Sequence, residues 1–174
     1  MFREGDLVQY GLNGVCKITQ ICEENFCGKK EMYYILTPVT RSNNTVYVPL
    51  SNEALVGKMR RILQPEEIYA IIDAMPDEKA DWIEDSVARK ETFRTILKSG
   101  DCFRIMKMIK SLYLHKQELL ENGKKLHAGD EQLFREAENI LYEEFALVLH
   151  IQKDEVVPLI AKKLDRQSCE KALS

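Results

Sequence analysis

The side chains that could bind a metal or attack a substrate are scattered along this chain. Its three histidines are His115, His127 and His150, and its five cysteines are Cys16, Cys22, Cys27, Cys102 and Cys169. No two histidines stand at metal-ligand spacing, and the first three cysteines are separated by five and then four residues, unlike a zinc pair. The sequence therefore predicts no metal, no cofactor and no enzymatic activity.

A backbone loop that binds phosphate is not predicted either. The turn at residues 11–14 has two glycines, but it lacks the following helix and the lysine that such a loop needs. Adjacent acids, as at residues 66–67 and 143–144, are usually solvated faces of helices. We therefore expect no small-molecule ligand.

Trp82 is the single tryptophan, and it lies in a stretch dominated by charged and turn-forming residues, 76–86. A tryptophan usually buries a large apolar area in a core or an interface. Two interpretations follow. The ring folds back onto a neighbouring helix, or it is a contact residue for a partner.

Basic residues follow Trp82 in two sets. The first set is Arg89, Lys90 and Arg94, and the second is Arg104, Lys107 and Lys110. Each set is either the solvated face of an amphipathic helix or a stripe that follows DNA phosphates.

The charge of the chain argues against a basic nucleic-acid-binding domain. The net charge is −3, with 8 basic against 6 acidic residues in 1–62 (+2) and 17 against 22 in 63–174 (−5). Any DNA contact must therefore come from a local patch. No apolar run is long enough to cross a membrane, and the N-terminus lacks the apolar stretch of a signal peptide. Scattered cysteines in odd number suit a reducing compartment, so we expect a cytoplasmic protein without a membrane partner.

The first part of the chain has the pattern of strands. Four short runs rich in branched and aromatic residues predict strands over 7–10, 15–21, 32–36 and 45–49. Turns with Gly or Asn are predicted between them, over 11–14, 25–30 and 41–44. Pro49 places the last strand at an edge or an end. Such spacing predicts a small barrel or a strongly bent antiparallel sheet.

From residue 63 onward the apolar residues recur at helical spacing. Pro65 and the two acids after it open a first helix, and Asp101 is placed to cap a long one. The predicted helices cover 65–75, 89–98, 102–122, about 133–148 and 153–164, and the last ten residues are expected to fray. The fold class is therefore two-domain α and β, with a β domain over 1–62 and an all-α domain over 63–174.

This order of modules, with a tryptophan near the front of the helical one, resembles the CarD/CdnL family of bacterial transcription regulators. The matching residues in the first module are Phe2, Gly5, Asp6, Val8, Tyr10, 13–15, Gly28, Tyr33, Tyr34, Leu36 and 46–49. Those in the second are Trp82, 99–101, the basic helix to Lys116, Glu131, Ala137 and 141–147. The first module alone also resembles the polymerase-interacting domain of transcription-repair coupling factor.

The resemblance implies a fold and a function. The first module would be a Tudor-like or SH3-like antiparallel β-barrel that docks on the RNA polymerase β subunit through the strand around Val46, Tyr47 and Val48. The helical module would lie on promoter DNA without reading its sequence. Trp82 would wedge into the minor groove at the upstream edge of the melted −10 region and so stabilise the open promoter complex.

The second module departs from the family pattern beside the tryptophan. Many members have basic residues directly after it, whereas this chain has acids, so phosphate contacts are expected from Arg89, Lys90 and Arg94. A Ser or Thr that caps a later helix in many members is His127 here, and Asp130 could take over that cap.

In the first module, Glu24 and Tyr47 stand where many members carry basic polymerase-contacting residues. The resemblance then implies a docking surface suited to a different polymerase. The acids after Trp82 and the net charge of −5 on 63–174 keep a second hypothesis open. It is a protein–protein adaptor that docks on polymerase and makes no direct DNA contact.

Overall fold

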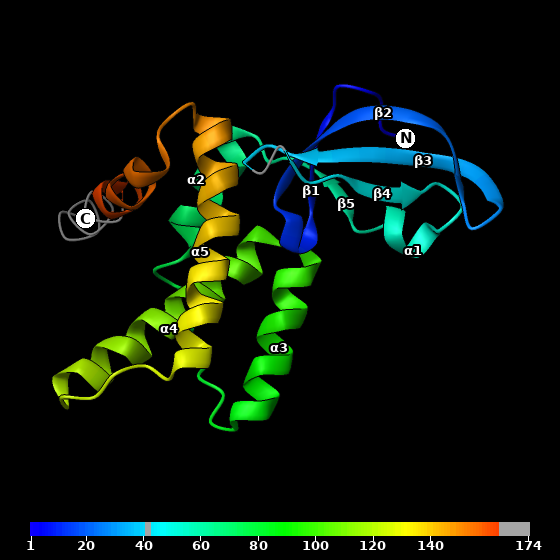
Figure 1. Cartoon of the computed structure of the whole chain (residues 1–174). Coiled ribbons are helices and arrows are strands. Elements are labelled where there is room, and N and C mark those ends of the chain that lie inside the picture. The colour runs from blue at the N-terminus through cyan, green and yellow to red at the C-terminus, as the bar shows by residue number, and fades with distance from the viewer. Residues whose placement is uncertain (41–42, 164–174) are drawn as a thin grey trace. The chain divides into compact units, whose positions relative to one another are not determined.

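The computed structural model describes residues 1–40 and 43–163 (Figure 1). Backbone contacts divide the chain into two compact units. The first comprises Met1–Ile62 with Lys98–Gly100, and the second comprises Leu63–Leu97 with the residues from Asp101 on. Part of the predicted turn at 41–44 and the last ten residues, expected to fray, lie outside the described residues. None of the helices in the described part is long and apolar enough to span a membrane.

The first unit is a five-stranded antiparallel sheet with the strand order β4-β3-β2-β1-β5. Its elements are β1 (Leu7–Tyr10), the short 3-10 helix η1 (Gly11–Asn13), β2 (Val15–Phe26), β3 (Lys29–Pro38), β4 (Val46–Pro49), α1 (Glu53–Val56) and β5 (Met59–Arg61). The sheet confirms the predicted antiparallel β module. The sequence missed α1 and β5, because elements of three or four residues are too short to show a period.

The hairpin of β2 and β3 is much longer than predicted, and the two strands run side by side to a tight tip (Figure 1). The predicted turn over 25–30 is wrong at its flanks, since Asn25 and Phe26 pair with the opposite strand. Only Cys27 and Gly28 form the turn, with φ angles of 53° and 82°. Two central residues with positive φ are what a tight hairpin requires.

A β-bulge interrupts β2. The register with β3 shifts between Ile18 and Gln20, so Thr19 is an extra residue, and its hydroxyl donates a hydrogen bond to the Ile35 carbonyl at 3.0 Å. Because of this extra residue, Ile18 and Ile21 both face the interior although their spacing is odd. The buried interior consists of Val8, Cys16, Ile18, Tyr34, Leu36, Val48 and Met59.

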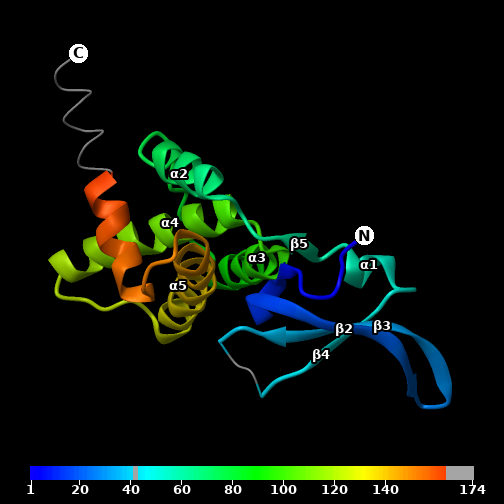
Figure 2. The same ribbon diagram turned by 90° about the horizontal axis from the view of Figure 1, so that it is seen from above.

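The described part of the second unit is helical, with α2 (Pro65–Ala74), α3 (Ser86–Ser99), α4 (Cys102–Glu121) and α5 (Ala128–Leu149). A 3-10 turn, η2 (Lys153–Glu155), leads into further helical residues, 156–163. Both views show α4 and α5 next to each other (Figures 1 and 2), and their core includes the fully buried Leu112 and Phe145.

Side-chain caps explain where the helices begin. The Asp101 carboxylate accepts a hydrogen bond from the Arg104 N–H at 3.1 Å, as predicted for the start of α4. At the start of α5, His127 Nδ1 accepts from the Gly129 N–H at 3.1 Å. The prediction that Asp130 takes over this cap is wrong, because its carboxylate is bonded to Arg89 on α3.

Candidate functional sites

Trp82 lies in the segment that connects α2 to α3, residues 75–85 (hereafter the connecting segment). Its side chain is partly buried and packs against the core of the second unit. The indole stacks on the imidazole of His115, with ring centroids 3.7 Å apart and an interplanar angle of 17°. The guanidinium carbon of Arg89 lies 4.3 Å from the indole centroid. The ring therefore folds back onto α4, as one interpretation predicted, and still keeps part of its surface exposed.

Side chains of helix α4 hold the connecting segment through the backbone carbonyls of the segment. The Lys110 ammonium donates to the carbonyls of Met75 at 2.6 Å and Glu78 at 2.7 Å. One residue further, the Ser111 hydroxyl donates to the carbonyl of Asp81 at 3.0 Å. The imidazole that stacks on the indole comes one turn later on the same face of α4. The segment is thus aligned along this helix up to the tryptophan.

These bonds settle what the second basic set does. Lys107 forms an ion pair with Glu78 at 2.8 Å, and Lys110 is bonded to backbone carbonyls. Arg104 is the exposed member of the three. Two of the three cations therefore serve the connecting segment, and the set does not form a stripe open to phosphates.

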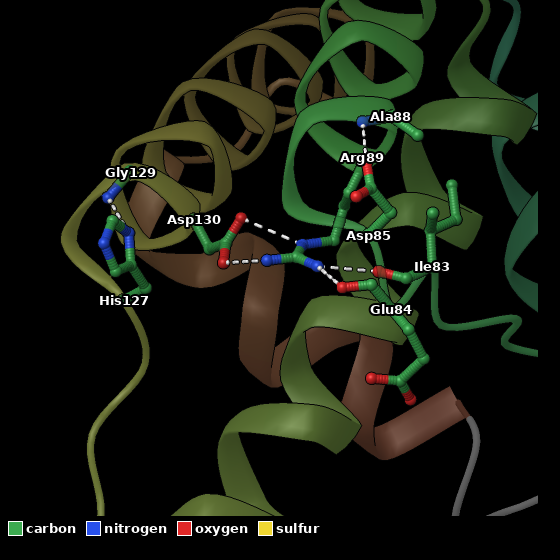
Figure 3. Close-up of polar contacts among 8 residues, drawn as sticks. All are labelled: Ile83, Glu84, Asp85, Ala88, Arg89, His127, Gly129 and Asp130. Atoms are coloured by element: carbon green, nitrogen blue, oxygen red, sulfur yellow. Dashed lines mark hydrogen bonds and ion pairs between the residues drawn. The ribbon is translucent and has the colours of Figure 1, made fainter.

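Arg89, which the sequence predicted to contact DNA, is buried, with 7% of its surface exposed. Its Nε and Nη2 donate to the carboxylate oxygens of Asp130 at 3.1 and 2.8 Å (Figure 3). Its Nη1 donates to the carbonyls of Ile83 at 2.6 Å and Glu84 at 3.1 Å. The predicted phosphate contact is corrected accordingly, because these guanidinium nitrogens already donate to partners inside the protein.

The acids after Trp82 also receive an explanation. Asp85 is the residue before α3, and its carboxylate accepts from the Ala88 N–H at 2.7 Å, which caps the helix (Figure 3). This cap lets α3 begin at Ser86, three residues earlier than predicted. The Glu84 side chain is exposed and points away from the ion pair (Figure 3).

Lys90 and Arg94 are the other two cations of the first basic set. Arg94 is exposed and Lys90 partly so, and neither forms an ion pair within residues 1–40 and 43–163. The Lys90 ammonium lies over the first turn of α5, since a Cβ built on Gly129 would meet its Nζ at 3.3 Å. A helix N-terminus carries partial positive charge, so a cation there leaves a local field that favours an anion.

A cavity of about 270 Å³ adjoins the connecting segment. Asp81 and Ile83, the neighbours of Trp82, line it together with apolar side chains of α3 and α4 such as Phe93 and Phe103. Lys107 and Ser111, which bond to the segment, also line the cavity, so the segment is incompletely packed against α3 and α4 here.

In the first unit, three aromatic rings gather on the sheet face opposite its core. Phe26 packs edge-to-face against Tyr33 and Tyr47, with centroids 5.2 and 5.1 Å apart. Phe26 and Tyr47 are 44% and 43% exposed, so the cluster forms an open apolar surface. Glu24, two residues before Phe26, lies on the same face by strand alternation. The sequence singled out Glu24 and Tyr47 but missed Phe26, because it assigned that residue to a turn.

The other two predicted polymerase contacts point inward. Val48 is fully buried, and Val46 packs against the same core. The side chain of Val48 is therefore closed to a partner, Val46 is partly exposed, and Tyr47 is the exposed side chain of β4.

The backbone of Tyr47 faces the free edge of the sheet, since β4 is an outer strand. The Leu50 N–H donates to the Met32 carbonyl at 2.9 Å, which makes these two residues a hydrogen-bonded pair. Such pairs recur every two residues in an antiparallel ladder, so Val48 and Val46 also bond to β3. The N–H and C=O of Tyr47 consequently point outward, as strand addition requires.

Glu31 supports the aromatic surface from β3. Its carboxylate accepts hydrogen bonds from the Ser51 hydroxyl, the Tyr33 hydroxyl and the Lys29 ammonium. These bonds hold the pKa of Glu31 below its ordinary value, with the Ser51 bond contributing most. Neither unit, over the residues described, contains a cluster of three side chains able to hold a metal ion.

Two family models match the chain. The model described as the CarD-like/TRCF RID domain matches residues 2–63, and the model described as the CarD C-terminal domain matches residues 68–161, which is more than half of the chain. No curated protein matches it. The order of the two matches follows the two modules of the sequence. The chain therefore belongs to the CarD family of RNA-polymerase-interacting transcription regulators.

Proposed function

We propose that this protein is a non-enzymatic regulator that docks on the RNA polymerase β subunit and stabilises the open promoter complex. Its first unit provides the docking surface, and the exposed part of Trp82 enters the minor groove at the upstream edge of the bubble. Family membership supports polymerase binding, and the geometry around Trp82 supports the wedge.

One observation carries the proposal. Trp82 is the single tryptophan, it is partly exposed, and stacking on His115 holds it. An apolar ring inserted at a disturbed base step must offset a few kcal/mol of unstacking. A ring that is already immobilised loses less conformational entropy on insertion, so more of its contact energy remains to hold the strands apart.

Lys90 and Arg94 are the cations that would meet the DNA phosphates next to this wedge. They lie one turn apart on α3, four residues from each other, and so share one face of the helix. Their contribution would be attraction to phosphate without sequence preference.

The wedge is tested with Trp82→Ala in the full chain, by measuring the lifetime of open complexes and the affinity for polymerase separately. We expect a shortened lifetime and unchanged affinity. Tyr113→Ala is the matched control, because Tyr113 is an aromatic residue of the same unit that is 50% exposed and lies outside the connecting segment. An unchanged lifetime in Trp82→Ala would contradict the wedge.

The docking mode is tested by two substitutions at Tyr47. Tyr47→Ala removes only the ring from the aromatic surface, whereas Tyr47→Pro also removes the outward N–H, at an edge position where proline is compatible with a strand. We expect both to weaken polymerase binding and the proline variant to weaken it more. Equal affinities of the two variants would exclude a backbone bond from Tyr47.

A second candidate function is the adaptor that makes no DNA contact. The observation that favours it is the coverage of the indole by His115 together with the exposed acid Glu84 beside it. A promoter footprint of the polymerase complex that does not change when the protein is added would support the adaptor over the wedge.

A further inference from the structure

We propose that Arg89 and Asp130 form a clasp that fixes Trp82 in position, with Arg89 acting as a positioning residue and not as a DNA contact. The effect on DNA rests on the proposed function, whereas the clasp itself can be tested on the free protein. It joins three parts of the second unit: α3, the first turn of α5 and the connecting segment.

The geometry of Arg89 assigns it two tasks at once. One edge of its guanidinium makes two hydrogen bonds to the Asp130 carboxylate, at 2.8 and 3.1 Å. The remaining nitrogen, Nη1, holds the carbonyls of the two residues that directly follow Trp82. The planar group also lies against the indole, 4.3 Å from its centroid. One side chain therefore constrains both the backbone beside the tryptophan and the ring.

Asp130 sets the orientation of the Arg89 guanidinium. The carboxylate is 2% exposed and sits in the first turn of α5, where the partial positive charge of the helix stabilises an anion. This fixed carboxylate orients the planar guanidinium group of Arg89. A lysine could not replace the arginine here, because an ammonium group lacks the planar geometry.

The incomplete packing of the segment explains why a clasp is needed. Asp81 and Ile83 border the cavity of about 270 Å³, so side-chain packing around these two residues is incomplete. The bond from Ser111 fixes the residue before Trp82, and Arg89 fixes the two after it. Without the second anchor, the backbone beside Trp82 is held on one side only.

The test uses the double variant Arg89→Met with Asp130→Leu. Replacing both members of a buried ion pair by apolar groups of similar size avoids an isolated buried charge, so the protein is expected to fold. The matched control is Lys116→Met with Glu131→Leu, which removes an ion pair of 3.3 Å between α4 and α5 that does not touch the connecting segment.

Tryptophan fluorescence of this protein comes from Trp82 alone, because the sequence has a single tryptophan. In the clasp variant we expect a red-shifted emission, stronger quenching by acrylamide and loss of the slow component of its fluorescence anisotropy decay. The control double variant should keep the wild-type values, and circular dichroism should show both proteins folded. An indole that keeps its wild-type emission, quenching and anisotropy in the clasp variant would overturn the proposal.

The open-complex lifetime then separates the clasp from the proposed function. A freed indole together with a shortened lifetime supports both. A freed indole with a wild-type lifetime, when Trp82→Ala also has a wild-type lifetime, supports the clasp and contradicts the wedge. If Arg89→Lys, which keeps the charge but not the fork, leaves the indole as fixed as in the wild type, the role of Arg89 is electrostatic and the clasp is wrong.

Discussion

At the scale of single residues, the buried Arg89–Asp130 pair makes the stability of the protein sensitive to one substitution. Removal of one partner leaves a buried charge without its counterion, and Asp130→Ala is expected to cost about 3–5 kcal/mol of unfolding free energy. Urea unfolding of the full chain measures this loss. Arg94→Ala is the control, since an exposed cation without an ion pair among the described residues should change stability by less than about 0.5 kcal/mol. Similar values for both variants would mean that the pair contributes little.

His115 gives a second prediction at this scale. The imidazole stacks on the indole with ring centroids 3.7 Å apart, so His115→Leu should change the emission intensity and wavelength of Trp82. Fluorescence spectra of the two proteins at one pH measure this change. His150→Leu, a replacement of an exposed histidine that is distant in the sequence, should leave the emission unchanged. An emission that stays the same in His115→Leu would argue against the stacked contact.

At the scale of elements, the two acids that follow Trp82 differ in what they contribute to the start of α3. Asp85→Ala removes the cap and is expected to cost about 1 kcal/mol, whereas Glu84→Ala, whose side chain is exposed, should cost less than about 0.5 kcal/mol. Thermal or urea unfolding distinguishes them. Only Asp85→Ala should also loosen the connecting segment in hydrogen exchange. If Glu84→Ala is the more damaging change, the capping role of Asp85 is misassigned.

The sheet has its own dependence on pH through Glu31. The pKa of this carboxyl is lowered in the folded state, so its contribution to stability is present above the unfolded pKa of about 4.3 and is lost as the pH falls through the lower folded value. Acid should therefore weaken the first unit, and Glu31→Gln should remove part of that dependence. Hydrogen exchange of β3 amides, compared at pH values on either side of this range, measures the effect. Equal dependence in both proteins would show that other carboxylates dominate.

At the scale of the whole molecule, the charge predicts weak binding to free DNA. With −5 on residues 63–174, the protein should have little affinity for a duplex at physiological salt and should reach DNA only when carried there by polymerase. Each phosphate contact contributes a slope of about −0.9 to the salt dependence of binding. The Lys90→Gln and Arg94→Gln variants should each make the salt dependence of complex formation shallower by about that amount. Tight binding to a free duplex would contradict this view.

The predictable parts of this molecule are the elements long enough for their apolar residues to repeat at a regular spacing. The helices α2 and α4 were found from their stripes and start signals, because apolar residues at helical spacing and a capping Asp101 act locally. The role of Arg89 was not predictable. Its partner Asp130 is 41 residues away, and no local signal separates a cation that pairs inside the protein from one that faces solvent.

The same limit applies to the aromatic surface. Phe26 lies next to Tyr47 only because β2 extends to a two-residue tip, and the turn-forming residues around Gly28 hid that extension. A pattern that combines Asn, Gly and Lys indicates a turn without fixing its length. The strand face to which Glu24 belongs followed from the register and not from the sequence.

The extra residue in β2 has a consequence for how this surface could vary among related chains. With Thr19 removed, Ile18 and Gln20 would still oppose Leu36 and Ile35, so every side chain of the hairpin would keep its face. Only the local twist that a bulge adds would be lost. A single-residue deletion at this point would therefore re-aim the distal half of the hairpin while leaving its composition untouched. Chain length at one position can thus tune the direction in which the aromatic surface meets a partner, independently of the residues that form it.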